Sequence, residues 1–150
     1  MWEEQLKIII EEKELYDEKI NEGISESEKR DFLEKVNEEL QVILPKEYIA
    51  LLNKVNGIEF NGYIIYGVDE YLLDTNPNQY VNGFIENNLI WYENEWQRKY
   101  IFIGESNFCW YVYGIESKRY FELDNPSGSE LEEFEDFESL IDKILEESVL

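Results

Sequence analysis

The chain changes from helical to strand-rich sequence within one stretch, Leu44-Pro45-Lys46-Glu47-Tyr48-Ile49-Ala50-Leu51-Leu52-Asn53-Lys54-Val55-Asn56-Gly57. Pro45 suits the first position of a helix, because the N–H that proline lacks has no partner there. The apolar residues after it recur at helical spacing and predict one buried face, made of Tyr48, Ile49, Leu52 and Val55. Asn56-Gly57 is expected to end this helix, since both residues tolerate the left-handed conformation.

The residues before this stretch predict two further helices. The first covers residues 2–21, where apolar side chains gather mainly on one side among Glu and Lys. The second begins after Ser25 and ends near Leu40. Ser25 and Glu28 have the spacing of a capping box, in which the two residues satisfy each other's free backbone N–H groups.

The residues after Gly57 predict strands, loops and two more helices. Asn61-Gly62 lies between two apolar runs, which indicates a hairpin of residues 58–60 with 63–68. A loop follows over 69–82, with a turn at Asn76-Pro77-Asn78, and then a helix over about 81–95. Residues 100–103, 108–113 and 119–123 predict three strands whose short connections favour an antiparallel meander. We expect a loop at 125–129 and a closing helix that starts at Phe134.

Within the second of these three strands, bulky side chains alternate between two faces. Phe108, Trp110 and Val112 share one face, and Cys109, Tyr111 and Tyr113 share the other. Because neither face is polar, this strand is expected to lie at the centre of the sheet, covered on both sides.

Composition indicates one acidic domain. The 150 residues include 35 acidic and 13 basic side chains, for a net charge of -22. Residues 1–40 carry 14 acidic and 6 basic side chains, and residues 101–150 carry 13 and 3, so both ends are more acidic than the middle. Such a field repels nucleic acid and anionic membranes and speeds encounter with a basic partner. The alternative is that the charge serves solubility alone.

Several kinds of chemistry are excluded by the residue types. The chain has no histidine, which removes Ser-His-Asp and Cys-His nucleophile systems and histidine-containing zinc sites. Its single cysteine, Cys109, permits no internal disulfide and reads as a small buried hydrophobe. We expect no metal and no cofactor. The first residues lack a signal-peptide pattern and no run is long enough to span a membrane, so a cytoplasmic protein is expected.

The order of motifs resembles the SUKH superfamily, which includes bacterial immunity proteins and the yeast cell-wall assembly regulator. The resemblance rests on Leu44-Pro45 followed by Tyr48, Leu52 and Asn56-Gly57, on the preceding helix, on Ile103-Gly104-Glu105-Ser106 before a strand, and on the Phe-rich acidic helix that closes the chain. It covers roughly residues 25–145. The helix over 2–21 is additional, and the small-residue insert usual after Gly-Glu-Ser is shortened here to Asn107.

The resemblance implies an α+β fold with a mixed, mostly antiparallel sheet and packed helices, forming a single domain over 1–150 with its core at about 25–147. It also implies a non-enzymatic immunity protein that binds a cognate toxin, often a basic nuclease, with no nucleic-acid or membrane partner. One alternative is a general cytosolic interaction module without a toxin. A remote alternative is a hydrolase that uses a carboxylate pair, Asp69 with Glu70 or Glu93 with Glu95.

The candidate contact residues are acidic and aromatic side chains of the strand-rich half. They are Asp69, Glu70, Tyr71, Asp74, Trp91, Tyr92, Glu93, Glu95, Trp96, Glu105 and Glu116. Aromatic anchors among them would supply affinity, and the carboxylates would supply steering. For each carboxylate, the alternative is a solvated loop residue with no contact role. For Trp91 and Trp96, the alternative is packing in the core. For Trp110, core packing is the preferred interpretation. Glu105 is as well suited to a structural hydrogen bond in its own turn.

Overall fold

The structure is a computed structural model that describes residues 2–74 and 81–150. Three helices come first: α1 (Trp2–Leu15), α2 (Glu26–Leu40) and α3 (Lys46–Lys54). The strands β1 (Ile58–Phe60) and β2 (Tyr63–Ile65), the short 3-10 helix η1 (Glu70–Leu72), α4 (Phe84–Trp91) and the 3-10 helix η2 (Glu95–Lys99) follow. The chain then forms β3 (Tyr100–Glu105), β4 (Cys109–Gly114), β5 (Tyr120–Asp124), β6 (Glu130–Phe134) and α5 (Phe137–Ser148). The predicted α+β class, with the additional first helix, is confirmed.

The six strands form one open sheet in chain order, β1 to β6, and every neighbouring pair is antiparallel. The only parallel pairing among the described residues is an isolated bridge between Gly67 and Gly83. Asn61 and Gly62 both have positive φ, as the hairpin turn requires, and the predicted β1–β2 hairpin is confirmed. The predicted meander of β3, β4 and β5 is confirmed as well.

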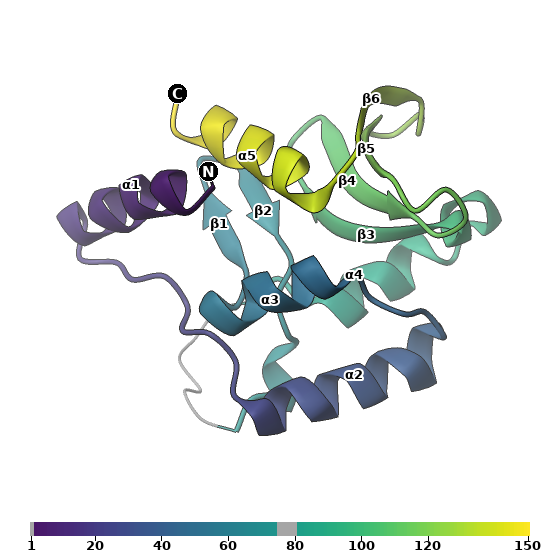
Figure 1. The fold of residues 1–150 in the computed structure, drawn as a ribbon, viewed down its shortest axis with the longest axis horizontal. Coiled ribbons are helices and arrows are strands. Elements are labelled where there is room, and N and C mark those ends of the chain that lie inside the picture. Colours follow the sequence, from purple (N-terminus) through teal and green to yellow (C-terminus); the bar gives the residue numbers. More distant parts are fainter. Residues whose placement is uncertain (1, 75–80) are drawn as a thin grey trace.

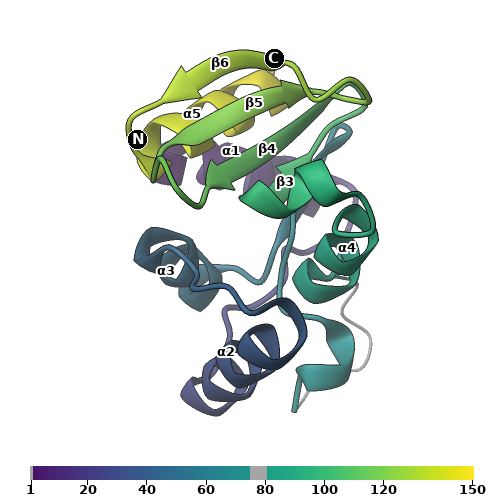
Figure 2. The same ribbon diagram turned by 90° about the vertical axis from the view of Figure 1, so that its right-hand side faces the viewer.

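Helices cover both faces of the sheet. Strand register places Tyr113 opposite Tyr120 and Tyr111 opposite Glu122, so these side chains share the face that α5 covers, where Tyr120 contacts Phe137. Phe102, Val112 and Phe121 share the other face, where Trp91 of α4 packs on Phe102. Figure 2 shows α2 farthest from the strands. The predicted central, doubly covered β4 is confirmed, except that Phe108 lies outside the strand and is exposed.

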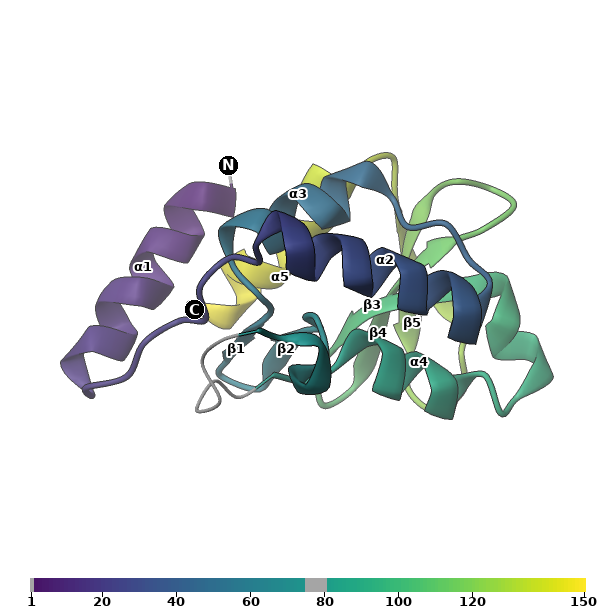
Figure 3. The ribbon, with the colours of Figure 1, turned by 90° about the horizontal axis from the view of Figure 1, so that it is seen from below.

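The N-terminal helix is held at one end of the molecule. In Figures 1 and 3, α1 lies beside α5 and away from β3–β6. Trp2 and Ile9 are buried and belong to the same hydrophobic cluster as Phe137 and Ile141 of α5. The helix ends at Leu15, earlier than the predicted residue 21.

The signature stretch joins the helices to the sheet through buried hydrogen bonds. Pro45 is the N-cap of α3 with an extended backbone, so its prediction as the first helical residue was one position off. Tyr48 is fully buried, and its hydroxyl donates to the backbone carbonyl of Tyr66 after β2. Gly57 has the expected positive φ. The Asn56 side chain binds a distant segment of the chain: its Oδ1 accepts from the N–H of Val68 at 2.6 Å.

One prediction for the second half was wrong, and another gave a helix that is too long. Residues 130–134 form β6, whereas a loop followed by a helix from Phe134 was predicted, and Asp136 caps α5 instead. A Glu-rich segment has low intrinsic strand propensity, which pairing with β5 overrides. The predicted helix over 81–95 is shorter in the structure: α4 covers Phe84–Trp91, and the 3-10 helix η2 begins at Glu95, the last predicted residue. The predicted turn at Asn76-Pro77-Asn78 lies outside the described residues.

Candidate protein-interaction surface

Asp69 has a structural role in positioning α4. It is 3% exposed, and its two carboxylate oxygens accept from the backbone N–H groups of Ile85 at 2.9 Å and Glu86 at 3.0 Å. These are free N–H groups of the first turn, so Asp69 caps the helix from a distant segment. Burial raises the pKa of this carboxyl, and the two N–H groups oppose that effect. Because its pKa is raised in the folded state, ionisation of Asp69 costs stability, and that cost appears as pH rises from the unfolded-state pKa through the folded-state pKa.

We expect Asp69→Ala to lower the free energy of unfolding by about 2 kcal/mol, since two N–H groups of the first turn of α4 lose their acceptor. Urea denaturation followed by circular dichroism measures this change. The matched control is Glu93→Ala, because Glu93 is exposed just after the same helix. That control is expected to change stability by less than about 0.5 kcal/mol. Equal effects of the two substitutions would contradict the capping role.

The other residues of the 69–74 segment face outward or hold the loop. Tyr71 is 65% exposed. Glu70 accepts from the N–H of Val81 at 3.1 Å, and the N–H of Asp74 donates to the buried Glu28 of α2 at 2.9 Å. Of this group, the structure therefore leaves Tyr71 as the large side chain available for contact.

The aromatic candidates gather around Trp110, which is 4% exposed, as core packing predicts. The ring of Trp91 lies 5.3 Å from that of Trp110, and the ring of Trp96 lies 6.1 Å away on η2. Trp91 is half-buried, whereas Trp96 is 40% exposed. Tyr92 is buried, its hydroxyl donates to the carbonyl of Tyr100 at 2.6 Å, and burial raises its pKa to about 12. Tyr92 is thus part of the core.

Glu105 belongs to a chain of hydrogen bonds that reaches Trp91. The Tyr66 hydroxyl donates to Glu105 Oε1 at 2.8 Å and accepts from Trp91 Nε1 at 3.2 Å. Burial, followed by the Glu105 charge, raises the pKa of Tyr66, so this hydroxyl stays protonated at neutral pH. Glu105 therefore accepts from the hydroxyl of Tyr66, whereas the predicted structural role was a bond to backbone N–H groups of its own turn. Glu116, by contrast, is an exposed residue between β4 and β5.

Four of the predicted residues lie where α4 ends and η2 begins, namely Trp91, Glu93, Glu95 and Trp96, and both tryptophan rings lie beside Trp110. Glu93 and Glu95 are exposed, and Glu95 lies 3.9 Å from Arg98. Sequence reasoning missed their neighbours Leu89 and Ile90, which are also exposed. Knowledge of which side of α4 packs on the sheet was needed to find them.

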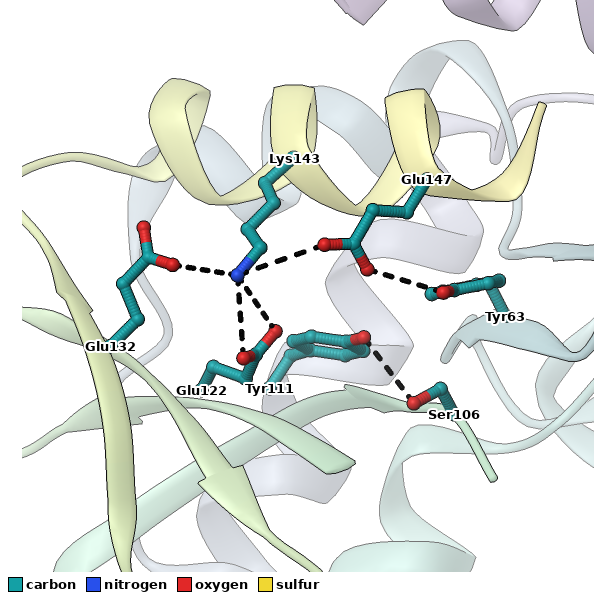
Figure 4. A network of polar contacts seen from close by, with 7 residues as sticks. All are labelled: Tyr63, Ser106, Tyr111, Glu122, Glu132, Lys143 and Glu147. Atoms are coloured by element: carbon teal, nitrogen blue, oxygen red, sulfur yellow. Dashed lines mark hydrogen bonds and ion pairs between the residues drawn. The ribbon is translucent and has the colours of Figure 1, made fainter. Parts of the chain in front are cut away.

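A cluster of charges lies on the opposite face of the sheet, under α5. Figure 4 shows Lys143 surrounded by Glu122, Glu132 and Glu147, with Lys143 Nζ at 3.2, 2.6 and 3.7 Å from their oxygens. Burial lowers the pKa of Lys143, but hydrogen bonds to Glu132 and Glu122 and the carboxylate charges outweigh it and hold that pKa above its usual range. The cluster is best explained as a link between α5 and the sheet.

The structure contains grooves elsewhere. One of about 760 Å³ lies between α1 and the β1–β2 hairpin, lined by Ile8, Tyr16 and Phe60 among others. A second of about 650 Å³ lies beside the connector before α3, lined by Leu44, Tyr113 and Tyr120 among others. Neither proposed catalytic pair, Asp69 with Glu70 or Glu93 with Glu95, lines either groove. Within residues 2–74 and 81–150, no group of three acidic or cysteine side chains is arranged to hold a metal ion.

Fold and surface together define an acidic α+β domain that presents exposed aromatic and acidic side chains on α4 and η2. A search of protein families matched residues 30–122 to the family SUKH_6, described as SMI1-KNR4 cell-wall. The chain belongs to this family, which confirms the resemblance to the SUKH superfamily. The match runs from α2 into β5 and leaves out α1, β6 and α5. No curated protein matched the chain. None of the described helices is long and apolar enough to cross a membrane.

Proposed function

We propose that this protein is a non-enzymatic immunity protein that neutralises a cognate bacterial toxin by direct binding. The observation that carries the proposal is SUKH_6 membership in a chain with a net charge of -22. The resemblance to SUKH proteins implies binding to a toxin that is often a nuclease. A nuclease presents a basic cleft to phosphate, and a folded surface rich in carboxylates can occupy such a cleft. Electrostatic steering makes this capture fast.

The 150 residues are further proposed to act as one domain in the cytoplasm. Trp2 and Ile9 of α1 share one hydrophobic cluster with residues of α3, the sheet and α5. This continuity supports a single folding unit, in which α1 is an addition to the matched family segment.

The test is protection of cells by co-expression with a toxin domain encoded beside this protein. We expect wild-type protein to restore growth and to bind the purified toxin domain one-to-one, with an association rate that falls about tenfold or more as salt rises from low to physiological concentration. A control of unrelated fold but similar negative charge is expected to give no protection. Unprotected cells together with absent binding would overturn the proposal. Tight binding to a neighbour without toxic activity would favour a general interaction module.

A further inference from the structure

The exposed side of α4 carries two apolar residues. Asn88, a polar residue, points inward and is fully buried, whereas Leu89 is 41% exposed and Ile90 is 49% exposed. Glu86 and Glu93 lie at helical spacing on either side of these two residues and are exposed. Glu95 and Trp96 follow a few residues later on η2 and are exposed as well. We call these six residues the α4–η2 surface.

The helix that carries this surface is fixed at both ends and in the middle. Asp69 caps its first turn, and the Tyr92 hydroxyl binds the carbonyl of Tyr100 just beyond its last turn. Asn88 binds both backbone groups of Phe102 in β3, each at 2.9 Å. The exposure of Leu89 and Ile90 therefore belongs to an ordered helix. A pre-organised apolar surface loses little conformational entropy when a partner covers it.

We propose that the α4–η2 surface is the contact site for the partner protein, and that the partner covers it with apolar side chains ringed by lysine or arginine. This inference deepens the proposed function, on which it rests. The charge of the surface selects the occupant: Glu86, Glu93 and Glu95 are acidic, and Arg98, which pairs with Glu95, is the nearest basic residue along the chain. A second copy of this chain would bring another charge of -22, and an anionic membrane or nucleic acid would likewise be repelled.

The two kinds of residue have separate tasks in this contact. Leu89, Ile90 and Trp96 provide apolar area that the partner removes from water, which lowers the dissociation rate. Glu93 and Glu95 lie at the rim, where charges mainly raise the association rate. Asp69 and Tyr92 act only indirectly, because their side chains are committed to holding α4.

The first test uses a basic amphipathic helical peptide of leucine and lysine as the probe, followed by amide NMR of the isotope-labelled full chain. We expect the strongest shift changes and line broadening at residues 86–96. L89Q/I90Q is expected to weaken peptide binding by about tenfold, because glutamine preserves the helix while removing the apolar contact. The matched control L15Q/I43Q removes two exposed apolar residues from other surfaces and is expected to bind like wild type. Shifts spread evenly over the acidic surface, or equal effects of both double variants, would overturn the inference.

The second test uses the toxin domain identified by the protection experiment. E93K/E95K is expected to slow association by about tenfold at low salt. The control E11K/E14K makes the same change of charge on α1, at the far end of the molecule in Figure 1, and is expected to slow association by less than about threefold. If wild type protects and all variants protect equally, the surface assignment fails while the proposed function stands. If wild type gives no protection but the peptide maps to residues 86–96, the proposed function fails while the surface assignment stands.

Discussion

Asn88→Ala is expected to lower the free energy of unfolding by about 3 kcal/mol, because it leaves both backbone groups of Phe102 without a partner. Asn88 Oδ1 accepts from the N–H of Phe102, and Nδ2 donates to the carbonyls of Phe102 and Phe84. The side chain is fully buried, so water cannot replace these bonds without opening the contact between α4 and β3. Urea denaturation measures the loss as a lower midpoint with an unchanged slope.

The neighbouring Asn87 provides the matched control. Its side chain makes one hydrogen bond, to the carbonyl of Gly83 within its own helix, and it is only half-buried. Asn87→Ala is therefore expected to cost less than about 1 kcal/mol. If the two alanine variants were equally stable, the attachment of α4 to the sheet would depend on apolar packing alone.

Local sequence signals predicted those elements that begin or end at a residue with a strong local preference, such as a helix cap or a turn residue. Ser25 and Glu28 form the predicted capping box, with bonds of 3.1 and 2.8 Å. Asn61-Gly62 forms the predicted turn, because few residues other than Asn and Gly adopt positive φ there readily. The bulky alternation along β4 indicated a central strand because both faces had to be covered.

Strand β6 and the start of α4 depend on contacts between distant segments. Glu132 and Glu133 of β6 find basic partners in Lys143 of α5 and Arg119 before β5, at 2.6 and 2.9 Å. These ion pairs reduce the repulsion within a glutamate-rich strand, and no local sequence pattern predicts the pairs. From the sequence alone, Asp69 is likewise indistinguishable from an ordinary loop carboxylate. Only the fold brings it to the first turn of α4, where it accepts from the N–H of Ile85.

For the candidate surface, the sequence identified the residue types but not all the positions. Trp91, Glu93, Glu95 and Trp96 were predicted as contact residues; the structure places both tryptophan rings beside Trp110 and leaves the two glutamates exposed. Leu89 and Ile90 are large aliphatic residues, which are usually buried in the core. They are exposed because Asn88, not an apolar residue, occupies the inward position against β3.

Lys143→Met is expected to lower the free energy of unfolding by about 3 kcal/mol at neutral pH, because it removes the cation from a group of carboxylates. Glu122 of β5 lies directly opposite Glu132 of β6, and like charges in such a pair repel. The Glu122 side chain is only 11% exposed, so water cannot screen it well once the ammonium is gone. Glu147 of α5 would lose the same partner and keep only the hydroxyl of Tyr63, at 3.1 Å (Figure 4).

The pH dependence of this effect follows from the raised pKa of Lys143. A lysine whose folded-state pKa lies above the usual 10.5 contributes its stability fully below that value and loses it as pH rises through the folded-state pKa. The difference in stability between wild type and K143M should therefore be full at neutral pH and shrink as pH rises through the folded-state pKa of Lys143.

Lys35→Met is the matched control, because Lys35 also pairs with two glutamates, at 3.6 and 3.5 Å, but on the exposed side of α2. Solvent screens such exposed pairs and they contribute little to stability, so K35M should be close to wild type although it changes the net charge equally. K143M/E122Q is expected to recover about half of the loss, since the amide removes the most buried unpaired charge. If K35M destabilised the protein as much as K143M, the loss would reflect the overall charge of -22 rather than the cluster that joins α5 to the sheet.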